Sequence, residues 1–242
     1  MLFVWCKVSF DEKRSHGSAV CETVYFFVEF VCVFPWKCVS LNNQNRGKIM
    51  DGILRKLPIG IQTFEKLREG DYLYVDKTAL VWRIASTETP YFLSRPRRFG
   101  KSLLLSTFEA YFEGKKELFE GLAIADMEKE WKTYPVFHLD LNAEKYDSPQ
   151  ALVEILSRQL TQWELKYGKG EDEETLSGRF AGVIRRASEQ ADRGVVVLVD
   201  EYDKPLLQAL DDGALLDDYR KTLKAFYGVL KSADRYLRFV FL

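Results

Sequence analysis

The stretch that decides the fold is Tyr91-Phe92-Leu93-Ser94-Arg95-Pro96-Arg97-Arg98-Phe99-Gly100-Lys101-Ser102-Leu103-Leu104-Leu105. Residues 91–93 are apolar, the middle carries Gly100-Lys101-Ser102, and the end has the pattern of an amphipathic helix. Strand, loop and helix in this order are the context in which a P-loop cradles phosphate groups. The sequence therefore predicts a phosphate-binding loop directly before the helix.

Each part of this loop can contribute to the binding of phosphate or of a metal ion. Backbone N–H groups at the start of a helix, together with the helix dipole, attract an anion. Lys101 adds a positive charge at the β- and γ-phosphates, and the hydroxyl of Ser102 is a suitable ligand for Mg²⁺. The pattern is therefore typical of a site for a nucleotide with its metal ion.

One position departs from the pattern G-x-x-x-x-G-K-[ST]. The residue five before Gly100 is Arg95, where the pattern has glycine. That glycine supplies a backbone conformation that is costly for other residues, although Pro96 can shape the turn differently by fixing φ. Gly100-Lys101-Ser102 therefore does not establish a nucleotide site by itself.

A second stretch, Val195-Val196-Val197-Leu198-Val199-Asp200-Glu201, supports the same prediction. Five apolar residues in a row predict a central strand of a parallel sheet, buried on both faces. Asp200 at its end can hold Mg²⁺ through water, and Glu201 can orient or deprotonate an attacking water. The alternative is a buried strand whose exit is capped by two solvated acids, but the two stretches together favour a nucleotide site.

Composition limits the alternatives. A chain of 242 residues, 47% hydrophobic, can hold one large domain, or one domain with an appendage. The net charge of −1 gives no general attraction to nucleic acid or to an anionic membrane. All four cysteines lie between Cys6 and Cys38, so the remainder suits the cytoplasm and no disulfide framework is indicated.

Residues 1–49 differ in character from the rest of the chain. The apolar run from Val24 to Trp36 is interrupted by Glu29 and is short of the roughly 20 residues of a membrane span. Three interpretations stay open: a weak membrane anchor, an extra element packed on the domain, or sequence that is not part of the natural protein. We favour the last, with the natural chain beginning at Met50.

From Leu57 onward, strand patterns alternate with helix patterns. Strands are expected at residues 72–76, 91–94, 135–141, 195–199 and 236–242, and helices at 64–68, 77–84, 102–113, 149–167, 180–187 and 215–230, with loops at 118–131 and 171–174. This alternation predicts an α/β fold, a mainly parallel sheet with helices on both faces.

Four stretches together resemble a bacterial family, the AAA-ATPase-like domain proteins. They are Leu57–Gln62, Tyr72–Thr78, Phe92–Ser102 and Asp200–Pro205. The resemblance covers about residues 52–242 and leaves residues 1–49 unmatched. The arginine-rich loop is also similar to the G-R-R-x-G-K-[ST] loops of related archaeal-type ATPases, so Arg95 is expected to be a family feature.

The resemblance implies an AAA-like P-loop NTPase domain over residues 50–242, a three-layer sandwich that uses ATP and Mg²⁺. It makes Lys101 and Glu201 the catalytic residues, and Ser102 and Asp200 the metal ligands. Such proteins often continue into a region similar to a restriction-type nuclease, and we expect this domain to be truncated before its γ-phosphate sensor and helical lid. The expected nucleotide-binding residues are Arg97, Arg98, Phe99, Gly100, Lys101, Ser102 and Leu103.

Several individual residues keep alternative interpretations. Arg97 and Arg98 either contact phosphate or pair with acidic residues across the site. His138 is expected to be a satisfied core histidine rather than a ligand. Asp140 is expected to cap a loop rather than touch the water shell of the metal. Candidates for the lining of the nucleotide pocket, on the resemblance alone, are Tyr74, Asp76, Lys77 and Thr78.

Two functions of different classes follow. The first is an ATP-binding protein with Mg²⁺-dependent hydrolysis in its intact form. The second is a non-catalytic switch or interaction module, favoured by the replaced glycine at position 95. Besides ATP, a protein partner or an oligomer is compatible with either function. Binding of nucleic acid through the arginine loop is a third possibility without support from the net charge, and apart from the weak-anchor interpretation of residues 1–49 nothing in the sequence indicates membrane association.

Overall fold

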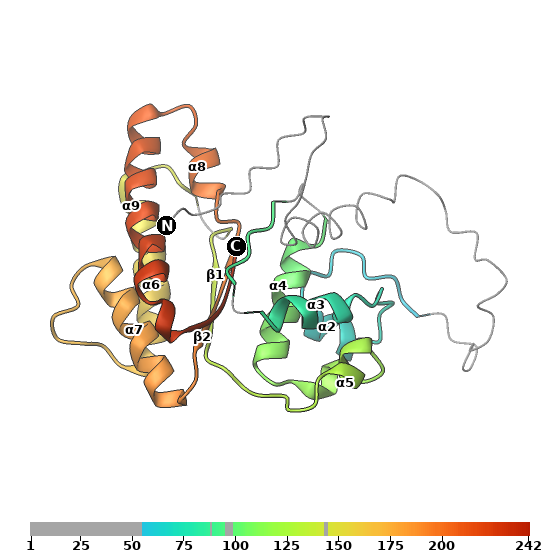
Figure 1. Cartoon of the computed structure of the whole chain (residues 1–242). Coiled ribbons are helices and arrows are strands. Elements are labelled where there is room, and N and C mark those ends of the chain that lie inside the picture. Colours follow the sequence, from blue (N-terminus) through green and yellow to red (C-terminus); the bar gives the residue numbers. More distant parts are fainter. Residues whose placement is uncertain (1–54, 88, 95–98, 143–144) are drawn as a thin grey trace, which may run out of the picture. The chain divides into compact units, whose positions relative to one another are not determined.

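Figure 1 presents a computed structural model of the chain, which describes residues 55–87, 89–94, 99–142 and 145–242. The chain divides into two units after Ile53. The fold described below is that of the second unit, Leu54–Leu242. The predicted N-terminal extension, residues 1–49, lies outside the described residues, as do Arg95, Pro96, Arg97 and Arg98.

The described chain contains both helices and strands, as the sequence predicts, but they do not alternate one by one: four α-helices precede the first strand, and two α-helices lie between each pair of successive strands. The α-helices are α2 (Phe64–Glu69), α3 (Thr78–Ala85), α4 (Lys101–Phe112), α5 (Ala123–Met127), α6 (Pro149–Tyr167), α7 (Leu176–Ala191), α8 (Lys204–Gln208) and α9 (Gly213–Ser232); the 3-10 helices are η2 (Lys116–Phe119) and η3 (Asp234–Tyr236); the strands are β1 (Val136–Asp140), β2 (Val195–Asp200) and β3 (Leu237–Phe241).

The sheet is parallel, with strand order β1-β2-β3. Tyr91 adds a single parallel bridge to Phe241 at the outer side of β3. Two hydrogen bonds extend this contact, from the Tyr91 N–H to the Val240 carbonyl at 2.8 Å and from the Leu93 N–H to the Leu242 carbonyl at 2.7 Å. The segment that leads into the predicted phosphate loop therefore runs beside β3, so β3 separates it from β2.

The central strand β2 is buried along its whole length, as its unbroken apolar sequence predicts. Val195, Val197 and Val199 belong to the core cluster that includes residues of α6, α7 and α9. Alternate residues point to the opposite face, where α4 packs against β1 and β2. Figure 1 shows α6, α7 and α9 on one side of these strands and α4 on the other.

Helix α4 is held on the sheet by aromatic rings. The ring of Phe108 lies 5.1 Å from Phe239 and 5.0 Å from Phe241, and Phe112 lies 5.0 Å from Phe239, measured between ring centroids. Phe108 and Phe112 are almost completely buried, and a buried ring of this kind contributes about 1.5–3 kcal/mol. These contacts fix the helix whose first residue is Lys101.

The other group of helices combines stacked rings with a buried ion pair. Phe180 of α7 stacks on Phe226 of α9 with ring centroids 4.3 Å apart. Arg179 of α7 binds Glu164 of α6 through two bonds, Nε to Oε1 at 2.8 Å and Nη2 to Oε2 at 2.7 Å. Because both side chains are largely removed from water, the pairing satisfies charges that would otherwise be costly to bury.

Three predicted elements are wrong. Within the described residues, the predicted strands 72–76 and 91–94 are each reduced to one isolated bridge, from Tyr72 to Lys56 and from Tyr91 to Phe241. Residues 118–131 are not a plain loop, since they contain part of η2 and all of α5. The helices η2 and α5 are only four and five residues long, and a strand needs a partner strand that local composition does not reveal.

Two details differ from what the sequence predicts, a capping Ser148 before α6 and a solvated loop over the charged residues 171–174. Ser148 occupies the position before α6, but its side chain makes no capping hydrogen bond, whereas Asp212 caps α9 by accepting from the backbone of Ala214 and Leu215. In the charged segment 171–174, Glu173 is not a solvated acid, because it pairs with Arg186 of α7. Gly182 makes this approach possible, since a Cβ there would lie 1.7 Å from Glu173 Oε1.

Candidate functional site

The first part of the candidate site is the start of α4. Gly100 precedes the helix with φ of 75° and ψ of 26°, a left-handed conformation that glycine adopts at little cost. Lys101 and Ser102 are then the first two residues of the helix. The N–H groups of this first turn have no partners within the helix, which makes them available to an anion.

Lys101 meets Asp200 at the carboxyl edge of the sheet. The Nζ of Lys101 lies 3.2 Å from Oδ1 of Asp200, and the two side chains are only 15% and 8% exposed. The same Oδ1 accepts the backbone N–H of Glu201 at 2.9 Å. Lys101 and Asp200, which come from the two predicted motifs and are far apart in the sequence, are thus in direct contact.

Glu201, directly after β2, has a strained backbone. Its φ of 51° lies in the left-handed region, which a residue with a side chain adopts at a cost of about 1–3 kcal/mol. Such residues concentrate at functional sites, where the surrounding structure holds them in place. The hydrogen bond from its N–H to Asp200 is one of the contacts that hold it.

Tyr202 is a site residue that was not predicted from the sequence. The Nζ of Lys101 lies 5.3 Å from the centroid of the Tyr202 ring, and that ring packs edge to face on Phe92, with centroids 4.9 Å apart. Burial, assisted by the nearby charges of Asp203 and Glu201, raises the pKa of Tyr202 to about 12. Tyr202 directly follows Asp200 and Glu201 in the sequence, but its contacts with Lys101 and Phe92 leave no local sequence signal.

The structure places the remaining predicted residues as follows. Ser102 and Leu103 are half-buried in the first turn of α4, and Phe99, just before Gly100, is 44% exposed. Arg97 and Arg98 lie outside the described residues. The structure thus brings together Lys101, Asp200 and Glu201, with Ser102 adjacent in the same turn of helix.

His138 connects β1 to the helix of the phosphate loop. Its Nδ1 lies 2.9 Å from Oε2 of Glu109 on α4, while Nε2 is buried without a hydrogen-bond partner among the described residues. The predicted satisfied core histidine is therefore satisfied at one nitrogen only. Burial lowers the pKa of His138, but Glu109, with the charges of Asp200 and Asp140, outweighs burial and raises it above 6.5.

Asp140 lies opposite Asp200 in the strand register, at the same edge of the sheet. Its Oδ1 accepts the backbone N–H of Asn142 at 2.7 Å, which is the loop-capping contact expected of it. Lys204 approaches the same loop from the other side, with Nζ donating to the carbonyl oxygen and to Oδ1 of Asn142. The loops after β1 and β2 are thereby joined next to the Lys101–Asp200 pair.

The candidates on the segment before α3 have structural contacts instead. Oδ2 of Asp76 accepts the N–H of Ala123 at 2.7 Å, and Oγ1 of Thr78 accepts the N–H of Ile124 at 3.1 Å. These bonds satisfy the start of α5 and join it to α3. Tyr74 packs on the ring of Phe64, and its burial raises its pKa to about 12.

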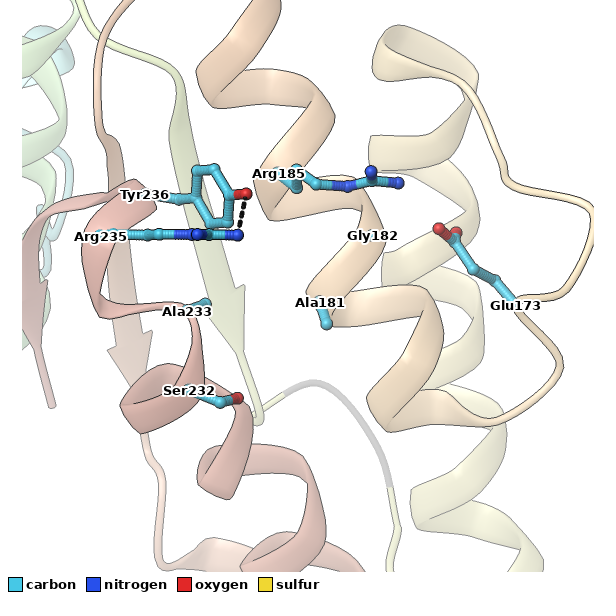
Figure 2. A pocket seen from close by; sticks show the side chains of 8 residues that line it. All are labelled: Glu173, Ala181, Gly182, Arg185, Ser232, Ala233, Arg235 and Tyr236. Carbon is cyan, nitrogen blue, oxygen red and sulfur yellow. Dashed lines mark hydrogen bonds between the residues drawn. The ribbon is translucent and has the colours of Figure 1, made fainter.

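A cavity of about 300 Å³ lies at the other edge of the sheet (Figure 2). It lies beside Tyr236, which directly precedes β3, so it is at the amino ends of the strands. There the guanidinium of Arg235 covers the Tyr236 ring at 4.6 Å and donates to its hydroxyl at 2.6 Å. None of the predicted site residues is among those that line this cavity, which are Glu173, Ala181, Gly182, Arg185, Ser232, Ala233, Arg235 and Tyr236.

Among the residues that the structure describes, no group of three or more His, Cys, Asp or Glu side chains is arranged to hold a metal ion. Within the same residues, every helix lacks the combination of length and apolar character needed to cross a bilayer.

Comparison with known proteins identifies the family. The sequence profile of the AAA-ATPase-like family, described as predicted AAA-ATPase, matches residues 58–242. The chain belongs to the AAA-ATPase-like family. The resemblance inferred from the four sequence stretches is therefore confirmed.

One relative of this AAA-ATPase-like chain is an uncharacterized protein in the vnfD 5' region of Azotobacter chroococcum mcd 1. The two are 41% identical over 189 residues, which is 78% of this chain and 37% of the relative. The chain thus spans about 37% of the length of the relative that it matches. No solved structure matches the chain.

The His138–Glu109 pair gives a pH dependence that can be measured. Because the pKa of folded His138 is raised, its charged form contributes stability that is fully present below about pH 6.5 and is lost as the pH rises through the raised pKa. In an NMR titration of the imidazole Hε1 signal, we expect a midpoint above 6.5, which Glu109→Gln lowers.

The sequence has two histidines, so His16→Gln assigns the signal of His138. A midpoint that Glu109→Gln leaves unchanged would show that the carboxylate does not stabilise the imidazolium.

Proposed function

We propose that this AAA-ATPase-like domain binds ATP together with Mg²⁺ and, in the intact protein, hydrolyses it. The contact between Lys101 and Asp200 carries the proposal. It lies at the carboxyl edge of a parallel sheet, where open α/β sheets bind their ligands, and it adjoins the start of α4. Lys101 and the N-terminus of α4 can bind the phosphates of a nucleotide, and the carboxylate of Asp200 beside them can bind its metal ion.

Phosphate binding would be the task of Lys101 and the first turn of α4. The N–H groups that follow Gly100 would donate hydrogen bonds to the phosphate oxygens, and the ammonium of Lys101 would leave Asp200 for the β- and γ-phosphates. The exchange replaces one buried carboxylate partner of Lys101 by another anion, so the ammonium is never left without a counter-charge.

The metal would be held by oxygen atoms, the ligands that Mg²⁺ prefers. The hydroxyl of Ser102 lies one residue after Lys101 on α4, and the carboxylate of Asp200 already contacts Lys101, so both donors belong to the same small region. Bound Mg²⁺ would neutralise charge on the phosphates. Once Lys101 moves, the carboxylate of Asp200 becomes available for the metal.

Glu201 would act on the attacking water. It follows the metal-side Asp200 directly, and its strained φ fixes the backbone at the point where the side chain leaves the sheet. A carboxylate there can orient the water and accept its proton. Around the phosphates, Arg97 and Arg98 would supply further positive charge, and Phe99 and Leu103 would complete the nucleotide-binding loop.

Three further parts of the proposal concern the whole domain. We assign residues 50–242 to a three-layer P-loop NTPase sandwich of the AAA-like type, which the helices packed against both faces of the sheet support. A cytoplasmic location is supported by the absence of cysteine after Cys38. A protein partner or an oligomer remains compatible with the site.

Replacing Lys101 tests the binding proposal. Lys101→Ala removes the charge that meets the phosphates, and charge-assisted bonds of this kind correspond to about 10- to 100-fold in affinity. We expect calorimetric titration with Mg–ATP to detect binding to the wild-type chain and little or none to the variant. Lys115→Ala, which removes a more exposed lysine just beyond α4, is the matched control. Equal affinity of Lys101→Ala and wild type would remove the proposal.

The second candidate, a nucleotide-dependent switch without turnover, is favoured by Arg95 at the position of the first glycine of the pattern. It differs from the first in phosphate release rather than in binding. A wild-type chain that binds Mg–ATP and releases no phosphate would select the switch.

Glu201→Gln tests the catalytic role. If Glu201 activates water, the variant should bind Mg–ATP within about twofold of wild type and release phosphate about 100-fold or more slowly, the contribution typical of a general base. Phosphate release would be followed under single-turnover conditions. Equal rates in the variant and the wild type would contradict the role given to this carboxylate.

A further inference from the structure

Lys101 has a second contact besides Asp200. Its ammonium lies over the ring of Tyr202, 5.3 Å from the centroid, and the lysine side chain is 15% exposed. The face of an aromatic ring attracts a cation, and the attraction increases as water is excluded. The ring thus holds the same charge that the proposed function assigns to the phosphates.

The ring of Tyr202 is itself held in place. It packs edge to face against Phe92, with ring planes 63° apart. Phe92 lies between two residues whose backbones are bonded to β3 and to Leu242. Tyr202 therefore links the loop after β2 to the segment that leads into the phosphate loop. The contact passes the end of β3, the strand that lies between them.

We infer that Tyr202 is a positioning residue of the nucleotide site, which keeps the ammonium of Lys101 at the carboxyl edge of the sheet when Asp200 turns to Mg²⁺. This inference rests on the proposed function. Without the ring, Lys101 would lose, among its contacts with the described residues, the one that remains when the metal engages Asp200. The side chain of Lys101 would then lose conformational freedom when the nucleotide binds, and this entropic cost would lower the affinity for the nucleotide.

The aromatic ring of Tyr202, and not its hydroxyl, positions the ammonium of Lys101. The contact joins the ammonium of Lys101 to the face of the ring, 5.3 Å from its centroid. Phenylalanine offers the same ring face and the same edge contact to Phe92. Tyr202→Phe should therefore replace the natural residue, whereas Tyr202→Leu should not.

The first experiment measures the contact directly and needs no nucleotide. Protons over the face of an aromatic ring resonate upfield, so the Hε signals of Lys101 should be shifted upfield in chain carrying ¹³C-labelled lysine. Lys101→Arg identifies the signal. We expect the shift in the wild type and in Tyr202→Phe, and its loss in Tyr202→Leu, or in Tyr202→Met should the leucine variant not fold. An Hε position that is the same in all variants would overturn the inference.

The second experiment measures Mg–ATP affinity. We expect Tyr202→Leu to bind about three- to tenfold more weakly than wild type, and Tyr202→Phe to bind within about twofold. Tyr236→Leu is the matched control, because it removes another half-buried ring covered by a cation, at the opposite edge of the sheet (Figure 2). It should lower the melting temperature without changing the affinity.

Failure of the proposed function and failure of the inference about Tyr202 give different results. If Lys101→Ala binds Mg–ATP as well as wild type does, the proposed function falls, and with it the positioning role. If Lys101→Ala loses binding while Tyr202→Leu binds as wild type does, the proposed function stands and the inference about Tyr202 is wrong.

Discussion

The ion pair between Lys101 and Asp200 is the interaction on which the rest of the account depends. Its partners come from α4 and β2, and they meet only because three conditions hold together. The strands are parallel, so their carboxyl ends share one edge; β3 lies between Tyr91 and β2; and α4 packs back onto the sheet. Both charges are largely buried, and burial of either one alone would be costly.

The remaining architecture can be understood as support for that contact. Phe108 and Phe112 fix α4 on β3, and His138 with Glu109 ties the same helix to β1. On the opposite face, α6, α7 and α9 bury the other side of β2. A buried strand held from both sides can maintain the left-handed backbone at Glu201, which an exposed loop would relax.

Much of this could be predicted from the sequence, because the two deciding stretches are local patterns. The unbroken apolar run of β2 predicts a central strand, and parallel strands bring Lys101 and Asp200 to one edge. Tyr202 could not be predicted, since its partner Phe92 is distant in sequence and a ring contact leaves no periodic signal. Residues 72–76 have strand-like composition, but in the part of the chain that the structure describes their pairing is the single bridge from Tyr72 to Lys56, and composition alone cannot reveal that.

The measurement that tests the central claim most directly is a crystal structure of the chain with Mg²⁺ and a non-hydrolysable ATP analogue. The account predicts that the ammonium of Lys101 leaves Asp200 for the β- and γ-phosphates, and that the metal lies between Ser102 and Asp200. A nucleotide bound elsewhere, with the Lys101–Asp200 contact intact, would contradict it.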